Sequence, residues 1–392
     1  MRKPTRANHP PNVEVPAGNQ PVVAPIYQSV KFEFETVDDT LRSLRGERAG
    51  FYYLRSSNPT TRQLELTLAE LQGREDCVVC ASGVGAIAQT LLSLTQQGDH
   101  VLCFIETYGP TRQLIRHTLE KFGVTHTLLS IGDLAGIERV LASRPTRLLA
   151  FESPTNPINR IADMEAMIRL ARAHGALTLL DNTLAGVHQH GQYDIDIYLH
   201  SLTKFVSGHG DVMGGAAIAN KSLIRALRPD FTLLGGVLDP HAAFLLQRGL
   251  KTYFVRYQAH SKNAQRIAEY LSTHAAVERT HYPGLASDPG HALARSQMSE
   301  FGSIVSMDLR AGAEGARRFA EALRLFAMTA SLGSTDSLVL PQQMFGGRDL
   351  TEEQQRVAGV TAGTVRLSIG LEDIDDLLED VRQALAAAEA VQ

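Results

Sequence analysis

Between residues 60 and 199, short apolar runs alternate with stretches whose apolar residues recur at helical spacing. The apolar runs predict strands at residues 77–80, 100–105, 147–151, 176–180 and 195–199. The intervening stretches predict helices near residues 60–72, 84–96, 111–122, 134–142 and 163–174. Such alternation is typical of a doubly wound α/β fold, in which helices cover both faces of a mainly parallel sheet.

The first of these helices shows its boundaries most clearly. Its apolar stripe consists of three leucines, Leu64, Leu68 and Leu71. Thr60 or Thr61 is expected to cap the N-terminus, because a hydroxyl can accept a hydrogen bond from a free amide of the first turn. Gly73 is expected to end the helix, because glycine adopts the left-handed conformation that follows many helices.

The pattern changes after about residue 250, where a long amphipathic stretch at 256–274 begins. The Tyr282-Pro-Gly turn follows, and then apolar runs at 303–309 and 364–369 frame a helical piece. A chain of 392 residues is longer than one core usually supports. We therefore expect a proline-punctuated N-terminal arm over 1–58, a first domain over 59–250 and a C-terminal domain over 251–392.

Composition and charge agree with a cytoplasmic enzyme that acts on a small molecule. The chain has 44% hydrophobic residues, 20% charged residues and a net charge of −4, without a basic patch for nucleic acid. No apolar run approaches the roughly 18 residues that a membrane helix requires. The first residues contain two early basic side chains but no apolar run behind them, so no secretory signal is predicted.

Two clusters of thiols and imidazoles have to be weighed as metal ligands. Cys77 and Cys80 form a C-x-x-C string within a predicted strand, where residues three apart face opposite sides. The two thiols would not converge, and we expect both in the core. His188 and His190 would share one face of an extended segment, but no third ligand is evident, so a metal site there is a minor alternative.

Polar and glycine-rich segments follow the predicted strands. They are Ser82–Gly85, Glu106–Tyr108, Glu152–Asn156, Asp181, and the group Ser201, Thr203 and Lys204. Ligands of open α/β sheets bind at the carboxyl ends of the strands, so we expect one site at this rim. Gly83 and Val84 open a predicted helix whose free amides could hold a phosphate. The G-x-G-x-x-G spacing of dinucleotide sites is missing, which counts against a nicotinamide dehydrogenase.

Lys204 and Asp181 suggest a specific cofactor chemistry. A lysine beside the hydroxyls of Ser201 and Thr203 suits a Schiff-base lysine next to a phosphorylated aldehyde. A carboxylate such as Asp181 would keep the ring nitrogen of pyridoxal phosphate protonated. From these residues alone, an ordinary surface lysine and an aspartate that caps a helix or turn remain open alternatives.

Several short motifs occur in an order and spacing that resembles the Cys/Met-metabolism family of pyridoxal-phosphate enzymes. They are YLRSSNPT at 53–60, ASGVGA at 81–86, YGPT at 108–111, ESPTNP at 152–157, DNT at 181–183, SLTK at 201–204, GLKT at 249–252 and VRLSIG at 365–370. This family contains cystathionine γ-synthases, cystathionine β- and γ-lyases, methionine γ-lyases and homoserine-ester sulfhydrylases. The resemblance covers about residues 22–385. It implies the fold-type I architecture of PLP-dependent transferases, with a mainly parallel, doubly wound sheet and a smaller C-terminal α/β domain.

The resemblance also implies how the cofactor, pyridoxal 5'-phosphate, would be held. Lys204 would bind its aldehyde and move protons between substrate carbons, and Asp181 would hold the pyridine nitrogen. Tyr108 would stack on the ring and assist protonation of the leaving group, although structural packing would also explain an aromatic residue there. The other contacts would come from Gly83, Val84, Ser201 and Thr203 at the phosphate, Asn156 at the ring hydroxyl, and Tyr53 and Arg55 of a neighbouring subunit.

Substrate contacts are implied in the C-terminal region. Arg366 would bind the substrate carboxylate in bidentate fashion, and its apolar sequence neighbours favour this role over a surface ion pair. Ser331 would contact Lys204 or the substrate. Ala330 offers neither charge nor hydrogen bond to a distal ammonium group, which predicts relaxed substrate choice. Departures from the family pattern concern substrate specificity more than cofactor binding, and they lie at Val84, Pro110, Gln113 and residues 340–343.

Together these features predict a PLP-dependent carbon-sulfur lyase or transferase of sulfur amino-acid metabolism, similar to cystathionine γ-synthase. It would eliminate or replace the γ or β substituent of cystathionine, methionine or an O-acylhomoserine, with γ elimination slightly favoured. The alternatives are a cystathionine β-lyase, an O-acylhomoserine sulfhydrylase and a non-catalytic cofactor-binding homologue. Because the arm would complete a neighbour's site, we expect a homo-oligomer, a tetramer built as a dimer of dimers.

Overall fold

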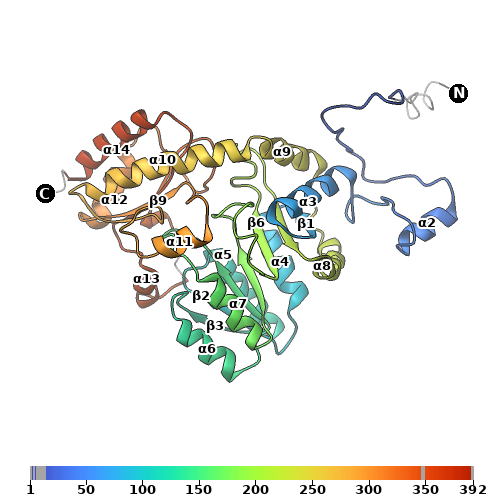
Figure 1. Cartoon of the computed structure of the whole chain (residues 1–392), viewed down its shortest axis with the longest axis horizontal. Helices are drawn as coiled ribbons and strands as arrows, with labels where there is room; N and C mark the ends of the chain where they lie inside the picture. Colours follow the sequence, from blue (N-terminus) through green and yellow to red (C-terminus); the bar gives the residue numbers. More distant parts are fainter. Residues whose placement is uncertain (1, 3–4, 6–14, 346–348, 390–392) are drawn as a thin grey trace.

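The structure is a computed structural model that describes residues 2, 5, 15–345 and 349–389. The first 14 residues, in which the sequence predicts no secretory signal, lie almost entirely outside the described residues. Two sheets organise the rest (Figure 1). The large sheet and its helices occupy the centre and lower part of that view, and the small sheet lies at the left.

The large sheet has seven strands among the described residues. They are β1 (Asp76–Cys80), β2 (His100–Phe104), β3 (Thr125–Leu129), β4 (Leu148–Glu152), β5 (Leu177–Asp181), β6 (Ile197–Ser201) and β7 (Gly215–Ala219). Their order is β1-β7-β6-β5-β4-β2-β3, and only the pairs that involve β7 are antiparallel. The mainly parallel sheet and the five predicted strands are therefore confirmed. The pattern of apolar runs does not predict β3 or β7.

Helices cover both faces of this sheet, as predicted. One face buries side chains of α3 (Pro59–Gln72), α6 (Leu134–Ser143), α7 (Met164–Ala173) and α9 (Pro240–Leu250). The other buries side chains of α4 (Gly83–Leu94), η1 (Leu114–Thr118), η2 (Leu119–Phe122) and α8 (Lys221–Leu234). The stretch predicted as one helix at 111–122 is instead a succession of α5 (Gly109–Gln113), the π-helical η1 and the 3-10 helix η2.

The start of α3 corrects one prediction. Neither Thr60 nor Thr61 is the N-cap, because Asn58 takes that position and its side chain accepts a hydrogen bond from the Thr60 amide at 2.9 Å. Pro59 explains the difference, because its fixed φ and missing N–H suit the first helical position. The residue before it is then the cap. Gly73 ends the helix with φ of 69°, as predicted.

The small sheet has the order β10-β11-β12-β9-β8. Its strands are β8 (Val277–His281), β9 (Ile304–Leu309), β10 (Ala327–Met328), β11 (Leu338–Pro341) and β12 (Thr364–Ser368). Around it lie α10 (Tyr253–Thr273), α11 (His291–Gln297), α12 (Gly312–Ala322), η3 (Gln342–Met344), α13 (Glu352–Ala358) and α14 (Ile374–Glu389). This region buries its own apolar cluster. The predicted boundary at 250/251 falls between α9 and α10.

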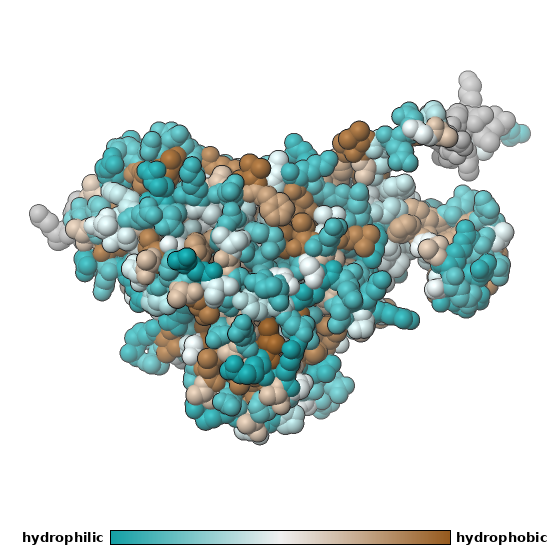
Figure 2. Space-filling view, viewed as in Figure 1, coloured by the Kyte–Doolittle hydropathy of each residue, from teal (hydrophilic) through white to brown (hydrophobic). Residues whose placement is uncertain are grey.

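The N-terminal arm projects away from both sheets (Figure 1). It contains α2 (Val37–Leu44), which has no buried residues, and one isolated bridge pairs Lys31 with Tyr53. Several apolar side chains of the arm are exposed, among them Val22 at 99% and Val37 at 77%. Figure 2 shows such hydrophobic residues beside hydrophilic ones on the arm.

The cysteines and histidines that were considered as metal ligands lie in apolar clusters or hydrogen-bond to other side chains. Cys77 and Cys80 lie in the apolar clusters on opposite faces of the large sheet, as predicted, and both are free thiols. His188 Nδ1 hydrogen-bonds to Tyr253 Oη, and His190 Nδ1 to Asn182 Oδ1. Within the described residues, no cluster of three potential ligands could hold a metal ion. No helix in the same ranges is long and apolar enough to cross a membrane.

Candidate active site

Lys204 is the centre of a cluster at the carboxyl ends of the parallel strands. It lies in the turn after β6, and its Nζ donates a hydrogen bond to Ser331 Oγ at 2.7 Å. Ser331 comes from the segment between β10 and β11 of the small sheet. Burial, followed by the positive charge of Arg366, lowers the pKa of the Lys204 amine to about 8. A lysine with this pKa is a better nucleophile and base near neutral pH than an ordinary surface lysine.

Arg366 lies within β12 and is only 5% exposed. Its Nη1 donates to Asn156 Oδ1 at 3.0 Å, and its Nη2 donates to the Ser331 carbonyl at 2.7 Å. Nε has no partner, and no carboxylate pairs with this guanidinium among the described residues. Burial lowers the pKa of Arg366 to about 10, so the group stays charged at neutral pH. The alternative of a surface ion pair is therefore wrong, and a buried cation without a counter-ion fits an anionic ligand.

Asp181 lies close enough to Tyr108 to affect the pKa of its phenol. Asp181 ends β5 and accepts a hydrogen bond from the Thr183 amide at 3.1 Å. Burial raises the pKa of its carboxyl. Burial also raises the pKa of the Tyr108 phenol, and the charges of Asp181 and Glu152 add to this effect. The Tyr108 side chain is 39% exposed at the rim, which leaves it free to face a ligand.

Glu152 is a site residue to which the sequence analysis assigned no role. This carboxylate ends β4 and is 2% exposed. It accepts hydrogen bonds from the Tyr108 amide at 2.8 Å and from the Asn156 amide at 3.0 Å. Burial, followed by the charge of Asp181, raises its pKa well above the usual value. Glu152 thereby fixes the backbone of two predicted cofactor residues at once. A glutamate directly after a buried strand was the available signal.

The predicted phosphate residues meet where α4 begins. Gly83 and Val84 form the first turn of α4, and Ser82 caps it by accepting a hydrogen bond from the Gly85 amide. A Cβ on Gly83 would lie 2.6 Å from Ser201 Cβ, so glycine lets β6 approach the helix N-terminus. Thr203 Oγ1 accepts a hydrogen bond from the Gly214 amide. The free amides of this first turn can bind an anion.

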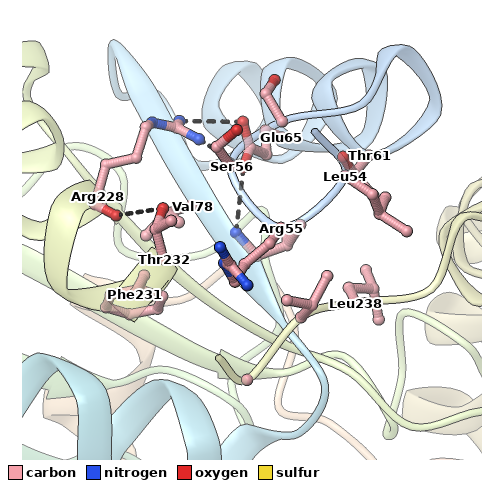
Figure 3. A pocket seen from close by; sticks show the side chains of 14 residues that line it. Leu54, Arg55, Ser56, Thr61, Glu65, Val78, Arg228, Phe231, Thr232 and Leu238 are labelled. Carbon is pink, nitrogen blue, oxygen red and sulfur yellow. Dashed lines mark hydrogen bonds and ion pairs between the residues drawn. The ribbon is translucent and has the colours of Figure 1, made fainter. Parts of the chain in front are cut away.

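Tyr53 and Arg55 are not brought to this cluster within one chain. The Arg55 guanidinium lies over the Tyr53 ring, 5.3 Å from its centroid. Figure 3 shows Arg55 in the lining of a small cavity between α3, β1 and α8, near Glu65 and Arg228. Within the described residues, neither Tyr53 nor Arg55 has a hydrogen bond, ion pair or ring contact with Lys204 or its neighbours.

Ala330 and Ser331 lie side by side at the small-sheet edge of the site. Ser331 has φ of 103°, a backbone conformation that residues with a side chain rarely adopt. Strain of this kind persists where surrounding contacts impose it, and it clusters at functional sites. Here the Ser331 hydroxyl contacts Lys204 and its carbonyl contacts Arg366. Ala330 is exposed and contributes only a methyl group.

A buried polar network behind the site was also missed. Gln72 Oε1, at the end of α3, accepts hydrogen bonds from Asn182 Nδ2 at 3.2 Å and from His200 Nε2 at 2.7 Å. Asn182 and His200 are the sequence neighbours of Asp181 and Ser201. Burial lowers the pKa of His200 to about 3, so its ring is neutral. The network fixes the ends of β5 and β6, but its members are too far apart in sequence to form a motif.

Sequence comparisons identify relatives of the whole chain. Residues 9–386 match the model of the family described as Cys/Met metabolism PLP-dependent enzyme. L-methionine gamma-lyase of Pseudomonas putida is 41% identical over 94% of this chain and 93% of that protein. Cystathionine beta-lyase of Lactococcus lactis subsp. cremoris is 36% identical over 93% of this chain and 94% of that protein.

Solved structures show the same architecture. The crystal structure of cystathionine gamma synthase from Xanthomonas oryzae pv. oryzae in complex with cystathionine matches with a TM-score of 0.89 and 36% identity, over 95% of this chain and 94% of that chain. A putative O-acetylhomoserine (thiol)-lyase from Campylobacter jejuni, solved with a pyridoxyl-lysine monophosphate, matches with a TM-score of 0.87 and 34% identity. That match covers 93% of this chain and 95% of the other.

Proposed function

Because the chain belongs to the family of Cys/Met metabolism PLP-dependent enzymes, we propose that it is a lyase that eliminates the γ-substituent of methionine and related sulfur amino acids. The observation that carries this proposal is the 2.7 Å contact between Lys204 Nζ and Ser331 Oγ, beside the buried guanidinium of Arg366. The 41% identity to a methionine gamma-lyase supports the choice of reaction. Ala330 supports relaxed specificity, because a methyl group selects weakly among distal groups.

The residues at the rim fit pyridoxal 5'-phosphate, the cofactor of this family. The amides of Gly83 and Val84 and the hydroxyls of Ser201 and Thr203 would hold its phosphate. Asp181 would pair with the ring nitrogen, Asn156 would contact the ring hydroxyl, and Lys204 Nζ would attach to the aldehyde carbon. When bound, the cofactor supplies an electron sink for the negative charge that develops on the substrate.

Lys204 is the base that this chain offers at the substrate. An amine with a pKa of about 8 is roughly one-tenth neutral at pH 7. Ser331 holds Nζ at the rim. A substrate that had replaced the lysine at the cofactor would leave this amine free to remove the Cα proton. Elimination at Cγ requires a second proton removal at Cβ, for which the same Nζ is the candidate.

Arg366 and Tyr108 would act at the two ends of the substrate. The Arg366 guanidinium would bind the α-carboxylate, because a planar fork matches a carboxylate with two parallel hydrogen bonds. The raised pKa of Tyr108 keeps its phenol protonated at neutral pH. The phenol is therefore suited to donate a proton to the leaving sulfur, and its ring is suited to stack on the cofactor.

The arm supports assembly of several copies of the chain. Among the described residues, Tyr53 and Arg55 contact no residue of the proposed site of their own chain, and the arm that carries them exposes apolar side chains such as Val22 and Val37. We infer a homotetramer in which the arm of one subunit completes the phosphate site of another. We further infer that the enzyme is cytoplasmic, acts on amino acids rather than nucleic acid, and divides at residues 58 and 250 into arm, cofactor domain and C-terminal domain.

Product identification tests the proposal. Purified holoenzyme is incubated separately with L-methionine, cystathionine and O-acetylhomoserine, with and without a thiol, and the keto acid is identified. Release of 2-oxobutanoate from L-methionine is the expected result. Pyruvate from cystathionine as the sole product would instead show a β-lyase, and thiol-dependent replacement without keto acid would show a sulfhydrylase.

Lys204→Ala is the control, because it removes the proposed base and leaves the phosphate residues in place. Its turnover should fall by at least about 10³-fold. Near-normal turnover in that variant would show that Lys204 is not the catalytic base.

A further inference from the structure

Arg112 and Asp349 form a buried ion pair between the two sheet regions. Arg112 lies on α5, one turn after Tyr108, and Asp349 lies between η3 and α13 of the small-sheet region. The Arg112 Nε and Nη2 atoms donate to the two carboxylate oxygens of Asp349, each at 3.0 Å. The two side chains are 5% and 7% exposed. A bidentate pair of this kind is both strong and directional.

The same guanidinium also holds the turn that carries Tyr108. Its Nη1 donates to the Ile105 carbonyl at 2.9 Å and to the Thr107 carbonyl. Thr107 directly precedes Tyr108 in the sequence. One side chain therefore connects the backbone beneath Tyr108 to a carboxylate of the small-sheet region. Arg116 reinforces the connection by donating to the Asp349 carbonyl at 2.8 Å.

Tyr108 is thus held from two directions. On the large-sheet side, Glu152 accepts a hydrogen bond from its amide at 2.8 Å. On the other side, Arg112 links the preceding carbonyl to Asp349. The small-sheet region that carries Asp349 also carries Ser331 and Arg366. The Arg112–Asp349 pair therefore connects the turn before Tyr108 to the region that carries the proposed substrate residues.

We propose that Arg112 and Asp349 are positioning residues that fix the Tyr108 ring relative to the substrate groups of the small-sheet region. The inference rests on the proposed function, in which Tyr108 stacks on the cofactor and protonates the leaving group. A purely structural ion pair would affect stability, since removing one partner leaves a buried charge. A positioning pair would in addition change the geometry and chemistry at Tyr108. Its effect on the reaction would disappear when Tyr108 is removed.

The experiment compares Asp349→Asn in the wild-type and in the Tyr108→Ala background, as holoenzyme. In the wild-type background, kcat for L-methionine should fall by about 10- to 100-fold, because small misplacements of a catalytic group have effects of this size. KM should change less than about threefold, because the carboxylate contact of Arg366 is untouched. The visible circular dichroism of the bound cofactor should also change. In the Tyr108→Ala background, the same substitution should cause less than about a twofold further fall.

Two further variants separate positioning from stability. Arg112→Lys keeps the charge but loses the fork, so it should recover part of kcat and part of the dichroism signal relative to Arg112→Gln. Arg74→Gln is a matched control. Arg74 also donates to loop carbonyls, those of Gly191 and Tyr193, but away from Tyr108. It should lower the melting temperature without changing the dichroism of the cofactor.

The outcomes distinguish this inference from the proposed function. An equal fall in kcat in the wild-type and Tyr108→Ala backgrounds would overturn it, as would unchanged kcat and unchanged dichroism in Asp349→Asn. If the wild-type enzyme released no keto acid from L-methionine, the proposed function would fail. The dichroism of the cofactor would then still test the positioning role. That role would be supported if Asp349→Asn changed the dichroism of the wild-type enzyme but did not change that of the Tyr108→Ala enzyme.

Discussion

The large sheet and the small sheet supply different kinds of groups to one site. Asp181, Ser201 and Lys204 come from the large sheet, at or just after the carboxyl ends of neighbouring parallel strands. Parallel strands place such ends at one edge, so strand packing alone brings these groups together. Arg366 and Ser331 come from the interior of a strand and from a strained turn of the small sheet. Hydrogen bonds that cross between the two regions link both residues to the large sheet.

The crossing contacts show how the two regions depend on each other. Arg366 Nη1 bonds to Asn156, which follows β4 of the large sheet, and Ser331 Oγ bonds to Lys204. The charge of Arg366 also contributes to the lowered pKa of Lys204. In the proposed function, the large sheet would provide a cofactor site that its own strands define, and the small sheet would adjust the reactivity of that site and add the substrate site. Variants that change one sheet region at a time test this division of roles between the two regions.

Arg366→Gln is expected to have the largest effect, chiefly on the substrate side. The kcat/KM for the amino-acid substrate should fall by about 100-fold or more, because losing one partner of a buried charged pair costs roughly 2–5 kcal/mol. The affinity for pyridoxal phosphate should stay within about threefold of wild type, since the phosphate contacts lie on the large sheet. Steady-state kinetics and cofactor titration measure the two quantities.

Arg366→Lys serves as the control for this substitution. It keeps the positive charge but loses the planar fork, so its kcat/KM should lie between those of wild type and Arg366→Gln. A loss of cofactor affinity equal to the loss of kcat/KM would contradict the division between the two regions. It would show that the small sheet is required to build the cofactor site.

Much of the large sheet could be predicted from sequence because most of its strands are marked by short runs of neighbouring residues. Continuous apolar runs marked the buried parallel strands, and the groups after them marked the rim. The two missed strands lack that signal. β7 (Gly215–Ala219) consists of glycine, alanine and one isoleucine, and β3 (Thr125–Leu129) mixes polar and apolar residues. The N-cap is Asn58, and not Thr60 or Thr61 as predicted, because Pro59 takes the first helical position ahead of both threonines.

The substrate side could be predicted only through family resemblance, and the supporting contacts were not predicted. Arg366 and Asn156 are 210 positions apart, and Arg112 and Asp349 are 237 apart, so no local pattern relates them. Lys204 and Ser331, which were both predicted at the site, meet through a hydrogen bond. The family match and the similar structures confirm the predicted fold and cofactor class. The roles assigned to individual residues stay predictions.

The pH dependence of cofactor capture tests the link between the two regions. Only the neutral amine of Lys204 can attack the aldehyde, and its folded-state pKa is lowered to about 8. Capture by the cofactor-free protein should therefore rise with pH and level off above pH 8. At pH 6 it should be about 100-fold slower than at the plateau. Absorbance of the bound cofactor follows the reaction, and N-acetyl-lysine measured in parallel corrects for titration of the cofactor itself.

In Arg366→Gln the rise of the capture rate should shift to higher pH. An unshifted profile would argue against electrostatic coupling between Arg366 and Lys204.

Gly83→Ala should have the smallest effect of the three, on the cofactor side alone. A Cβ at this position would lie 2.6 Å from Ser201 Cβ, so α4 and β6 must separate at the proposed phosphate site. Overpacking of this kind costs roughly 1–3 kcal/mol, and we expect about a tenfold or greater loss of affinity for pyridoxal phosphate. At saturating cofactor, KM for the amino acid should stay near wild type, because Arg366 is unaffected. Gly132→Ala is the matched control, since a Cβ there meets nothing within 4 Å. If Gly83→Ala raised KM and left cofactor affinity unchanged, the large sheet would not be the cofactor half of the site.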